Sequence, residues 1–244
     1  MLIAFLSDVH ANMPALEAAV ADATARGAER FICAGDMTGY GPFPDEVCLF
    51  LQNRPIPALI GNYDRKVLIV AEQGLSAAQG MKSKKRKILL WTLENLSHQS
   101  RLYLSGLPDQ LDMQLFSGHM LMVVHGSPIS MDDVIYPSIT RPGLTAKLGD
   151  LRPDILVCGH THIPFVRRID GILVVNCGSA GQPIDGDPRP SYVLVNTEQG
   201  APPSGRVIRF DYDHKRTIAA LEKTYLPKGL QKDLTEGSKR RFLS

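Results

Sequence analysis

The chain has 244 residues, of which 44% are hydrophobic and 21% are charged, and its net charge is +2. A chain of this length can bury a substantial core without disulfides or a metal, and its composition excludes a disordered, collagen-like or coiled-coil protein. The small net charge gives no reason to expect nucleic acid or a membrane surface as a partner. No apolar run reaches 18 residues, so we expect no membrane-spanning helix.

The first quarter of the chain alternates between apolar, β-rich runs and helical patterns. We expect strands over 2–7, 30–35 and 57–61, joined by helices over 14–27 and 44–54. That order predicts parallel central strands with right-handed crossovers. The first run lacks a basic leader and ends in Asp and His, which is typical of a strand and not of a signal peptide.

The rest of the chain changes from helical to antiparallel patterns. Residues 65–105 are mostly helical, a strand covers 154–160, and a closing helix covers 213–225. Turn residues separate strands that we expect to pair as 111–116 with 120–126, 165–169 with 172–178, and 191–197 with 205–212. The sequence therefore predicts one α/β domain over 1–225, with a polar tail over 226–244 that packs on it or is partly loose.

The cysteines indicate a reducing compartment. They form no CxxC pair and no zinc-type spacing, and three of them lie in or beside apolar strand-like runs. Buried, reduced thiols are therefore expected in preference to disulfides, as in a cytoplasmic protein. The four residues are Cys33, Cys48, Cys158 and Cys177.

Polar side chains of metal-ligating types follow five predicted strands. Ligands of open α/β sheets collect at the carboxyl ends of the strands, so these side chains should share one rim. The set comprises Asp8, His10, Asp36, Asn62, His125, His160 and His162. Mixed oxygen and nitrogen donors suit Mn, Fe or Zn, and the lack of cysteine argues against a structural zinc site. Seven ligands exceed the needs of one such ion, so we expect two ions with Asp36 as the bridge.

Each of these motifs alone is weak evidence. Most lone histidines are surface or core residues with ordinary hydrogen bonds, and Gly-Asp or Gly-Asn pairs are more often turns. The ordered occurrence of D-x-H, G-D, G-N-x-D, H-G and G-H-x-H, each after its own apolar run, favours the metal site.

The ordered motifs resemble those of the calcineurin-like metallophosphoesterase superfamily. The matching stretches are SDVHAN (7–12), GDMTGYGP (35–42), GNYD (61–64), VHGSP (124–128) and GHTH (159–162). The stretch over 176–189 resembles the small bacterial and archaeal branch that includes phosphodiesterases. The resemblance implies an α/β fold, a four-layer α/β/β/α sandwich of two mixed sheets flanked by helices.

The resemblance also implies how the ligands divide between two divalent transition-metal ions. One site would comprise Asp8, His10, Asp36 and His162, and the other Asp36, Asn62, His125 and His160. Mn or Fe is expected first, with Zn, Ni or Co as alternatives. A hydroxide that bridges the ions would then attack phosphorus in line, without a protein nucleophile.

One position departs from the family motif G-N-H-D, whose His contacts substrate phosphate or protonates the leaving group. Here Tyr63 stands in its place, while Asp64, which would orient that His, remains. A tyrosine with an unperturbed pKa of about 10 is a poor proton shuttle at neutral pH. We therefore expect diesters, or esters with good leaving groups, in preference to alkyl monoesters. Packing of Tyr63 at the rim without a catalytic role is the open alternative.

Two residues are weaker candidates for contacts with substrate. Asn12 contacts phosphate or caps the helix that follows it, and we favour the cap. Arg189 reaches the phosphate or is a solvated loop arginine, which we favour. The basic run over 82–87 steers an anionic substrate or forms a solvated helix face, and the latter is preferred.

The favoured function is a dinuclear metal-dependent phosphoesterase, acting as a phosphodiesterase on a small phosphorylated molecule or nucleotide. The alternative is a catalytically weak binding or scaffold protein on the same fold, but the presence of all seven ligands favours the enzyme. A protein phosphatase is less favoured, because Ile60 precedes Gly61 and Asp64 stands where such enzymes have Glu. Substrate, metal identity and oligomeric state stay open.

Overall fold

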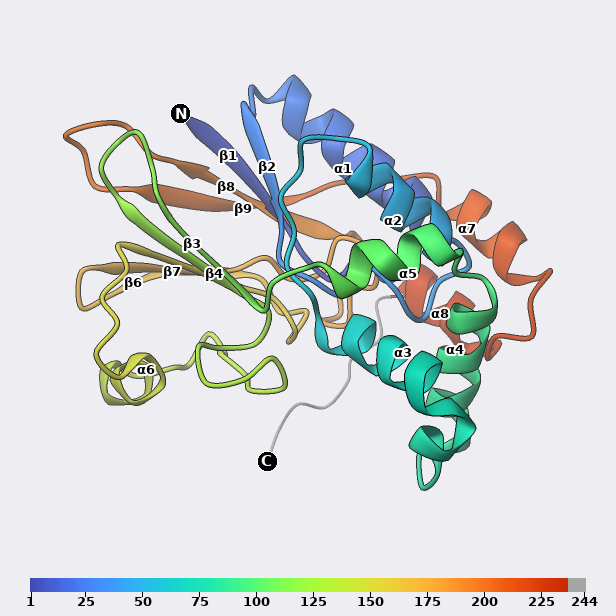
Figure 1. Cartoon of the computed structure of the whole chain (residues 1–244). Coiled ribbons are helices and arrows are strands. Elements are labelled where there is room, and N and C mark those ends of the chain that lie inside the picture. The colour runs from blue at the N-terminus through green and yellow to red at the C-terminus, as the bar shows by residue number, and fades with distance from the viewer. Residues whose placement is uncertain (237–244) are drawn as a thin grey trace.

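The computed structural model describes residues 1–236, which form two mixed β-sheets with helices on both outer sides (Figure 1). The first sheet has the order β2-β1-β8-β9, in which β1 runs parallel to β2 and antiparallel to β8. Its strands are β1 (Leu2–Leu6), β2 (Arg30–Cys33), β8 (Ser191–Asn196) and β9 (Ser204–Arg209).

The second sheet has the order β3-β4-β5-β7-β6. Its central strands β4, β5 and β7 are parallel, and an antiparallel strand closes each edge. The strands are β3 (Gln110–Gln114), β4 (Met120–Val124), β5 (Ile155–Cys158), β6 (Phe165–Ile169) and β7 (Ile172–Asn176). All three expected antiparallel pairs are confirmed.

The alternation of side chains along β1 explains the layering. Ile3 and Phe5 point into an apolar core between the two sheets, while Ala4 and Leu6 join a second core beneath the helices. All four are almost fully buried. Because both faces of β1 are buried, its sequence is apolar at every position and does not alternate with polar residues. Burial of each large side chain stabilises the fold by about 1.5–3 kcal/mol, which makes β1 a central element of both cores.

Helices cover the outer faces of both sheets. Those sharing an apolar core with the first sheet are α1 (Met13–Ala25), α2 (Pro44–Gln52), α3 (Asn62–Gln73), α4 (Ser83–Glu94), α5 (His98–Ser105), α7 (His214–Leu221) and α8 (Gly229–Glu236). A short 3₁₀ helix over Gly74–Ala78 follows α3. On the second sheet, α6 (Arg141–Leu148) packs Leu144 and Leu148 against β4, β5 and β7. The expected four-layer α/β/β/α arrangement is confirmed.

The structure differs from the sequence-based prediction in one strand and in two additional helices. The strand over 57–61 was wrong: this segment makes only an isolated bridge between Ala58 and Cys33, because Pro55 and Pro57 lack the N–H groups of a ladder. Helices α6 and α8 were not expected. In α8, Leu230 and Leu234 are buried in the core beneath the helices, whereas residues 237–244 of the expected tail lie outside the described residues.

The four cysteines are free and buried, as expected. Within residues 1–236, no helix combines the length and the apolar character that crossing a membrane requires.

Candidate metal centre

The seven expected ligands lie in loops at the carboxyl ends of strands and at the start of one helix. From the first sheet come Asp8, His10 and Asp36, from the second sheet His125, His160 and His162, and from the first turn of α3 Asn62. All are buried except the partly exposed His160. Backbone hydrogen bonds join the loops after β1 and β2, from Asp8 N to Gly35 O at 3.0 Å and from His10 N to Asp36 O at 2.9 Å.

Five of the seven ligands have a left-handed backbone. The φ angles are 53° for Asp8, 48° for His10, 52° for Asp36, 63° for His160 and 57° for His162. Non-glycine residues rarely adopt this region, and they hold it only where the surrounding structure requires it. Such residues cluster at functional sites, so the strain itself marks this rim as the candidate site.

Two glycines allow the ligand loops to touch. A Cβ on Gly61 would lie 2.1 Å from the backbone nitrogen of Asp36, and one on Gly159 would lie 2.5 Å from Oδ2 of Asp8. The first neighbour is a backbone atom, and the second is a carboxylate oxygen that hydrogen bonds from Ser7 and from the backbone of His160 hold in place. The glycines of the G-N and G-H motifs therefore serve close packing of one ligand loop against another.

Asp8, His10 and His162 form the first group of converging donors. The Nε2 atoms of the two histidines are 3.1 Å apart, and Oδ1 of Asp8 lies 3.1 Å from Nε2 of His162 and 3.6 Å from Nε2 of His10. These distances suit donors arranged around one ion. The group contains three of the four residues expected in the first metal site.

Asp36 lies between the two groups of donors. Its Oδ2 atom is 3.7 Å from Nε2 of His10 and 3.5 Å from Nε2 of His125. The second group of converging donors comprises Asp8, Asp36 and His125, so Asp8 is the residue common to the two groups. His160 is not a member of this group, but its ring packs edge-on against that of His125, with centroids 5.1 Å apart. The position of Asp36 suits the bridging role expected of it.

Backbone carbonyls orient three of the histidines. Nδ1 lies 3.0 Å from Thr38 O in His10, 2.8 Å from Ala34 O in His125 and 2.6 Å from Gln182 O in His162. A carbonyl oxygen can only accept, so each Nδ1 carries the hydrogen. In its neutral form each ring therefore turns a lone pair on Nε2 toward the centre, as metal-ligating histidines do.

The fourth histidine and Asn62 are positioned by other contacts. The backbone N–H of His160 donates to Oδ2 of Asp8 at 2.9 Å, which fixes the carboxylate. The amide nitrogen of Asn62 donates to Oδ1 of Asp132 at 2.6 Å, which turns Oδ1 of Asn62 the other way. Lys66 donates to the same Asp132 oxygen at 3.0 Å.

Burial and mutual charge set the ionisation of the centre. Burial alone would raise the pKa of Asp8, but the neighbouring His162 holds it well below its ordinary value. Burial lowers the pKa of His10 to about 4 against the charge of Asp36. Burial also opposes a charge on His125, yet the carboxylate of Asp36 raises its pKa to about 10. Two ionised carboxylates thus lie within a rim of histidine nitrogens.

The side chains of Tyr63 and Asp64 occupy different places. The ring of Tyr63 packs edge-on against His10, with centroids 5.6 Å apart, and its hydroxyl hydrogen-bonds to that of Tyr40. Asp64 accepts hydrogen bonds from the backbone of Thr38 at 2.9 Å and of Gly61 at 3.1 Å. Asp64 therefore braces the two ligand loops, and its pKa is raised by burial and by the charge of Asp36.

The weaker substrate candidates already have partners. Oδ1 of Asn12 accepts from the backbone of Ala15 at 3.4 Å, so Asn12 caps α1, as favoured. Arg189 forms an ion pair with Asp187 at 2.8 Å. The basic run over 82–87 is exposed around the start of α4, which agrees with a solvated helix face. A contact between Arg189 and phosphate would require its ion pair to open.

Buried polar atoms in the centre fit metal ions. Oδ1 of Asp8, Oδ1 of Asn62 and Nε2 of His125 are buried, and none has a hydrogen-bond partner within residues 1–236. Such atoms are rare in folded proteins, because each loses its hydration without replacement. All three are donors of the kind that Mn, Fe or Zn prefers. The residues present therefore fit divalent metal ions.

Sequence reasoning missed the residues that orient the ligands. Asp132 holds Asn62 from a loop 70 residues further along the chain, and Gln182 and Thr38 act on histidines through backbone carbonyls. A backbone contact leaves no trace in residue type, so no signal could have identified the last two. The adjacent pair of acidic residues after the V-H-G-S-P stretch was the only available sign of Asp132.

Comparisons with known proteins identify the family to which the chain belongs. Residues 1–200 match the model of the calcineurin-like phosphoesterase superfamily domain. The uncharacterized protein MJ0912 of Methanocaldococcus jannaschii is 27% identical over 253 residues, 97% of this chain and 98% of that protein. A metallophosphoesterase from Sphaerobacter thermophilus is 29% identical with a TM-score of 0.79, over 97% and 99% of the two chains. The hypothetical protein PH1004 of Pyrococcus horikoshii, 24% identical over 98% and 99%, shares the fold with a TM-score of 0.86. The chain belongs to the calcineurin-like phosphoesterase superfamily.

Proposed function

We propose that this chain is a dinuclear metal-dependent phosphoesterase that hydrolyses a small phosphorylated molecule or nucleotide, with diesters favoured. One observation carries the proposal: Oδ1 of Asp8, Oδ1 of Asn62 and Nε2 of His125 are buried without a hydrogen-bond partner among the described residues. A binding surface for a protein partner would not need these groups buried, because their desolvation is unfavourable unless a cation is bound.

The proposed first ion is held by Asp8, His10, Asp36 and His162, and the second by Asp36, Asn62, His125 and His160. Mn or Fe is proposed for both positions, with Zn, Ni or Co as alternatives, because mixed oxygen and nitrogen donors suit all of them. When bound, two such ions supply a nucleophile from water near neutral pH and neutralise charge on the phosphoryl group.

The chain's own residues prepare the site for that chemistry. The carbonyls of Thr38, Ala34 and Gln182 fix the rings of His10, His125 and His162, so no ligand must reorient during the reaction. Asp64 holds the loops after β2 and before α3 in contact. The centre is thus preorganised by backbone contacts that substrate does not disturb.

Tyr63 supports the preference for diesters. Its ring packs against that of His10 and its side chain is 8% exposed, so Tyr63 lies beside the centre. A phenol donates a hydrogen bond to a phosphoryl oxygen, but it transfers a proton poorly at neutral pH. Esters whose leaving group needs no proton in the transition state should therefore react fastest.

A metal-reconstituted activity screen tests the proposal. The substrates are bis-p-nitrophenyl phosphate, p-nitrophenyl phosphate and cyclic nucleotides, each with Mn and with Fe. We expect turnover of the diester that Asp36→Asn reduces at least about a hundredfold while the melting temperature stays close to that of the parent. Turnover that is absent on every substrate, or that survives Asp36→Asn, would refute the assignment.

The second candidate function is a catalytically weak binding or scaffold protein. Elemental analysis separates it from the enzyme before any substrate is known. We expect two metal ions per chain for the phosphoesterase. A chain that retains two ions but turns over no phosphoester would favour the scaffold, and a chain that binds none would refute both metal sites.

A further inference from the structure

A cavity of about 690 Å³ lies away from the metal centre. Its walls come from the first residues of β1 and β2, the segment 54–57, and the end of β3 with its following turn. Asp8 and Asp36 follow the opposite ends of β1 and β2. A five-residue strand spans about 17 Å, so this cavity is a separate feature of the molecule.

The walls of this cavity are mainly apolar. Ile3, Ile32 and Leu115 are buried and belong to the core between the sheets, while the side chain of Phe116 is 87% exposed. Ligand pockets measure about 300–1,000 Å³ and have walls of this kind with few polar groups. The size and the walls therefore suit a small molecule with an apolar body.

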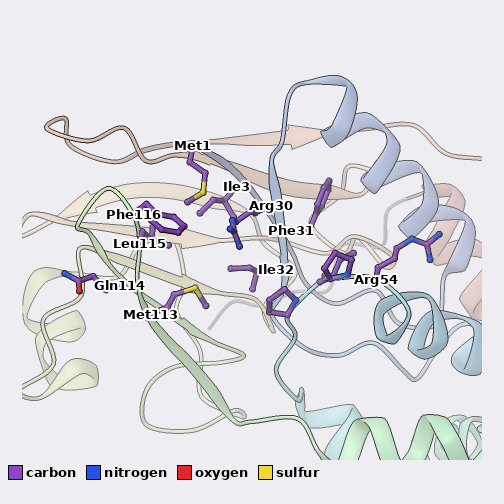
Figure 2. Close-up of a pocket in the computed structure, with 13 residues that line it drawn as sticks. Met1, Ile3, Arg30, Phe31, Ile32, Arg54, Met113, Gln114, Leu115 and Phe116 are labelled. Atoms are coloured by element: carbon purple, nitrogen blue, oxygen red, sulfur yellow. The ribbon is translucent and has the colours of Figure 1, made fainter.

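The positively charged side chain of Arg30 extends among these apolar side chains. Figure 2 shows Arg30 lying between Ile3 and Ile32 in the middle of the cluster, and its guanidinium carbon is 6.0 Å from the ring centroid of Phe116. Within residues 1–236, Arg30 forms no ion pair. Arg54 differs, because its guanidinium lies 3.5 Å from the ring centroid of Phe50 and extends away from the cluster in Figure 2.

We propose that this cavity binds a small molecule with an aromatic or aliphatic body and a single anionic group, which pairs with Arg30. The guanidinium presents fork-shaped donors to a carboxylate, sulfonate or phosphate, and the apolar walls take up the body. The exposed ring of Phe116 covers the body from the side of the solvent. Charge complementarity selects this occupant over a neutral one, since no acidic residue neutralises Arg30 within the described chain.

Two dyes that differ by one charge test the proposal on the full, metal-loaded chain. Anilinonaphthalene sulfonate carries the anionic group, and phenylnaphthylamine has the same aromatic body without it. Fluorescence titration should show saturable binding of both dyes. Arg30→Met should lower the affinity for the sulfonate dye by about tenfold and change the affinity for the neutral dye by less than about twofold.

A matched control separates this cavity from other positive surfaces. Arg86→Met removes one charge from the exposed basic run over 82–87, and it should leave the affinity for both dyes unchanged. Met113→Trp fills part of the cavity and should lower the affinity for both dyes. Melting temperature and circular dichroism check that this variant folds. Absence of saturable binding, equal effects of Arg30→Met on both dyes, or an equal loss in Arg86→Met would overturn the proposal. So would self-association that the dyes do not disturb and that Phe116→Ala abolishes, because a second copy would then occupy this face.

Discussion

Nε2 of His10 lies 3.1 Å from Nε2 of His162, and in the neutral rings neither atom carries a hydrogen. Each ring donates its Nδ1 hydrogen to a backbone carbonyl, so two lone pairs face each other beside the carboxylate of Asp8. This arrangement is unfavourable unless a cation lies between the donors. The stability of the fold should therefore depend on metal.

Metal loading is the first consequence. Adding Mn at about a hundred times its dissociation constant should stabilise the folded chain by about 2.7 kcal/mol, and a chelator should remove that gain. Differential scanning calorimetry measures the shift. His162→Asn should abolish most of it, whereas His98→Gln, on the exposed start of α5, should leave it intact. An equal shift in both variants would contradict the assignment.

Asp132 should control metal affinity without being a ligand. Asp132→Ala leaves the amide of Asn62 free to rotate, and loss of such an orienting contact weakens metal binding by about 10- to 100-fold. Lys66→Met is the matched control, because it removes the other partner of Asp132 and leaves the bond to Asn62. Isothermal titration with Mn compares the two. A larger loss in Lys66→Met would show that Asp132 does not act through Asn62.

Gly61 should not tolerate a side chain. Its Cβ would lie 2.1 Å from the backbone nitrogen of Asp36, so Gly61→Ala should destabilise the fold by about 3 kcal/mol or more. Gly106→Ala, where the nearest atoms are 3.6 Å from the added Cβ, should change stability by less than about 1 kcal/mol. Urea denaturation measures both values. A mild effect at Gly61 would mean that the two ligand loops can separate freely.

Tyr63→His should change which substrates react fastest. A histidine at this position can protonate a poor leaving group, so the ratio of diester to monoester turnover should fall. Tyr63→Phe removes the hydroxyl and should lower turnover of both classes without shifting the ratio. The activity screen above supplies the measurement. An unchanged ratio in Tyr63→His would support a packing role alone.

The buried thiols predict a response to alkali. Burial raises the pKa of Cys33 and of Cys158 to about 12, so both stay protonated in the folded chain. A raised pKa in the folded state favours folding below the ordinary thiol pKa, near 8.5, and that gain is lost as the pH rises toward 12. Urea titrations at increasing pH should therefore show falling stability above about pH 9. The native chain should also resist a thiol-modifying disulfide reagent at pH 8, and rapid labelling there would contradict the burial.

The sequence was informative wherever a side chain carried the signal. The polar residues that end each strand predicted which side chains meet at the candidate centre, and the turn residues between two apolar runs predicted the pairing of β8 with β9. The strand order of the first sheet could not be predicted. The pairing of β1 with β8 joins Leu2 to Asn196 through backbone hydrogen bonds, which do not depend on residue type. Nor could the contact between Asn62 and Asp132, whose partners are far apart in the chain.

The sheet order has a consequence for how the protein is made. His160 and His162 are made about 150 residues after Asp8 and His10, and β8, which pairs with β1, is made later still. Contacts of such long range form slowly, because the loop between them must close first. The metal centre therefore cannot be complete before residue 162 is made, and a nascent chain that stops between residue 162 and β8 has all the candidate ligands but an incomplete first sheet to hold them.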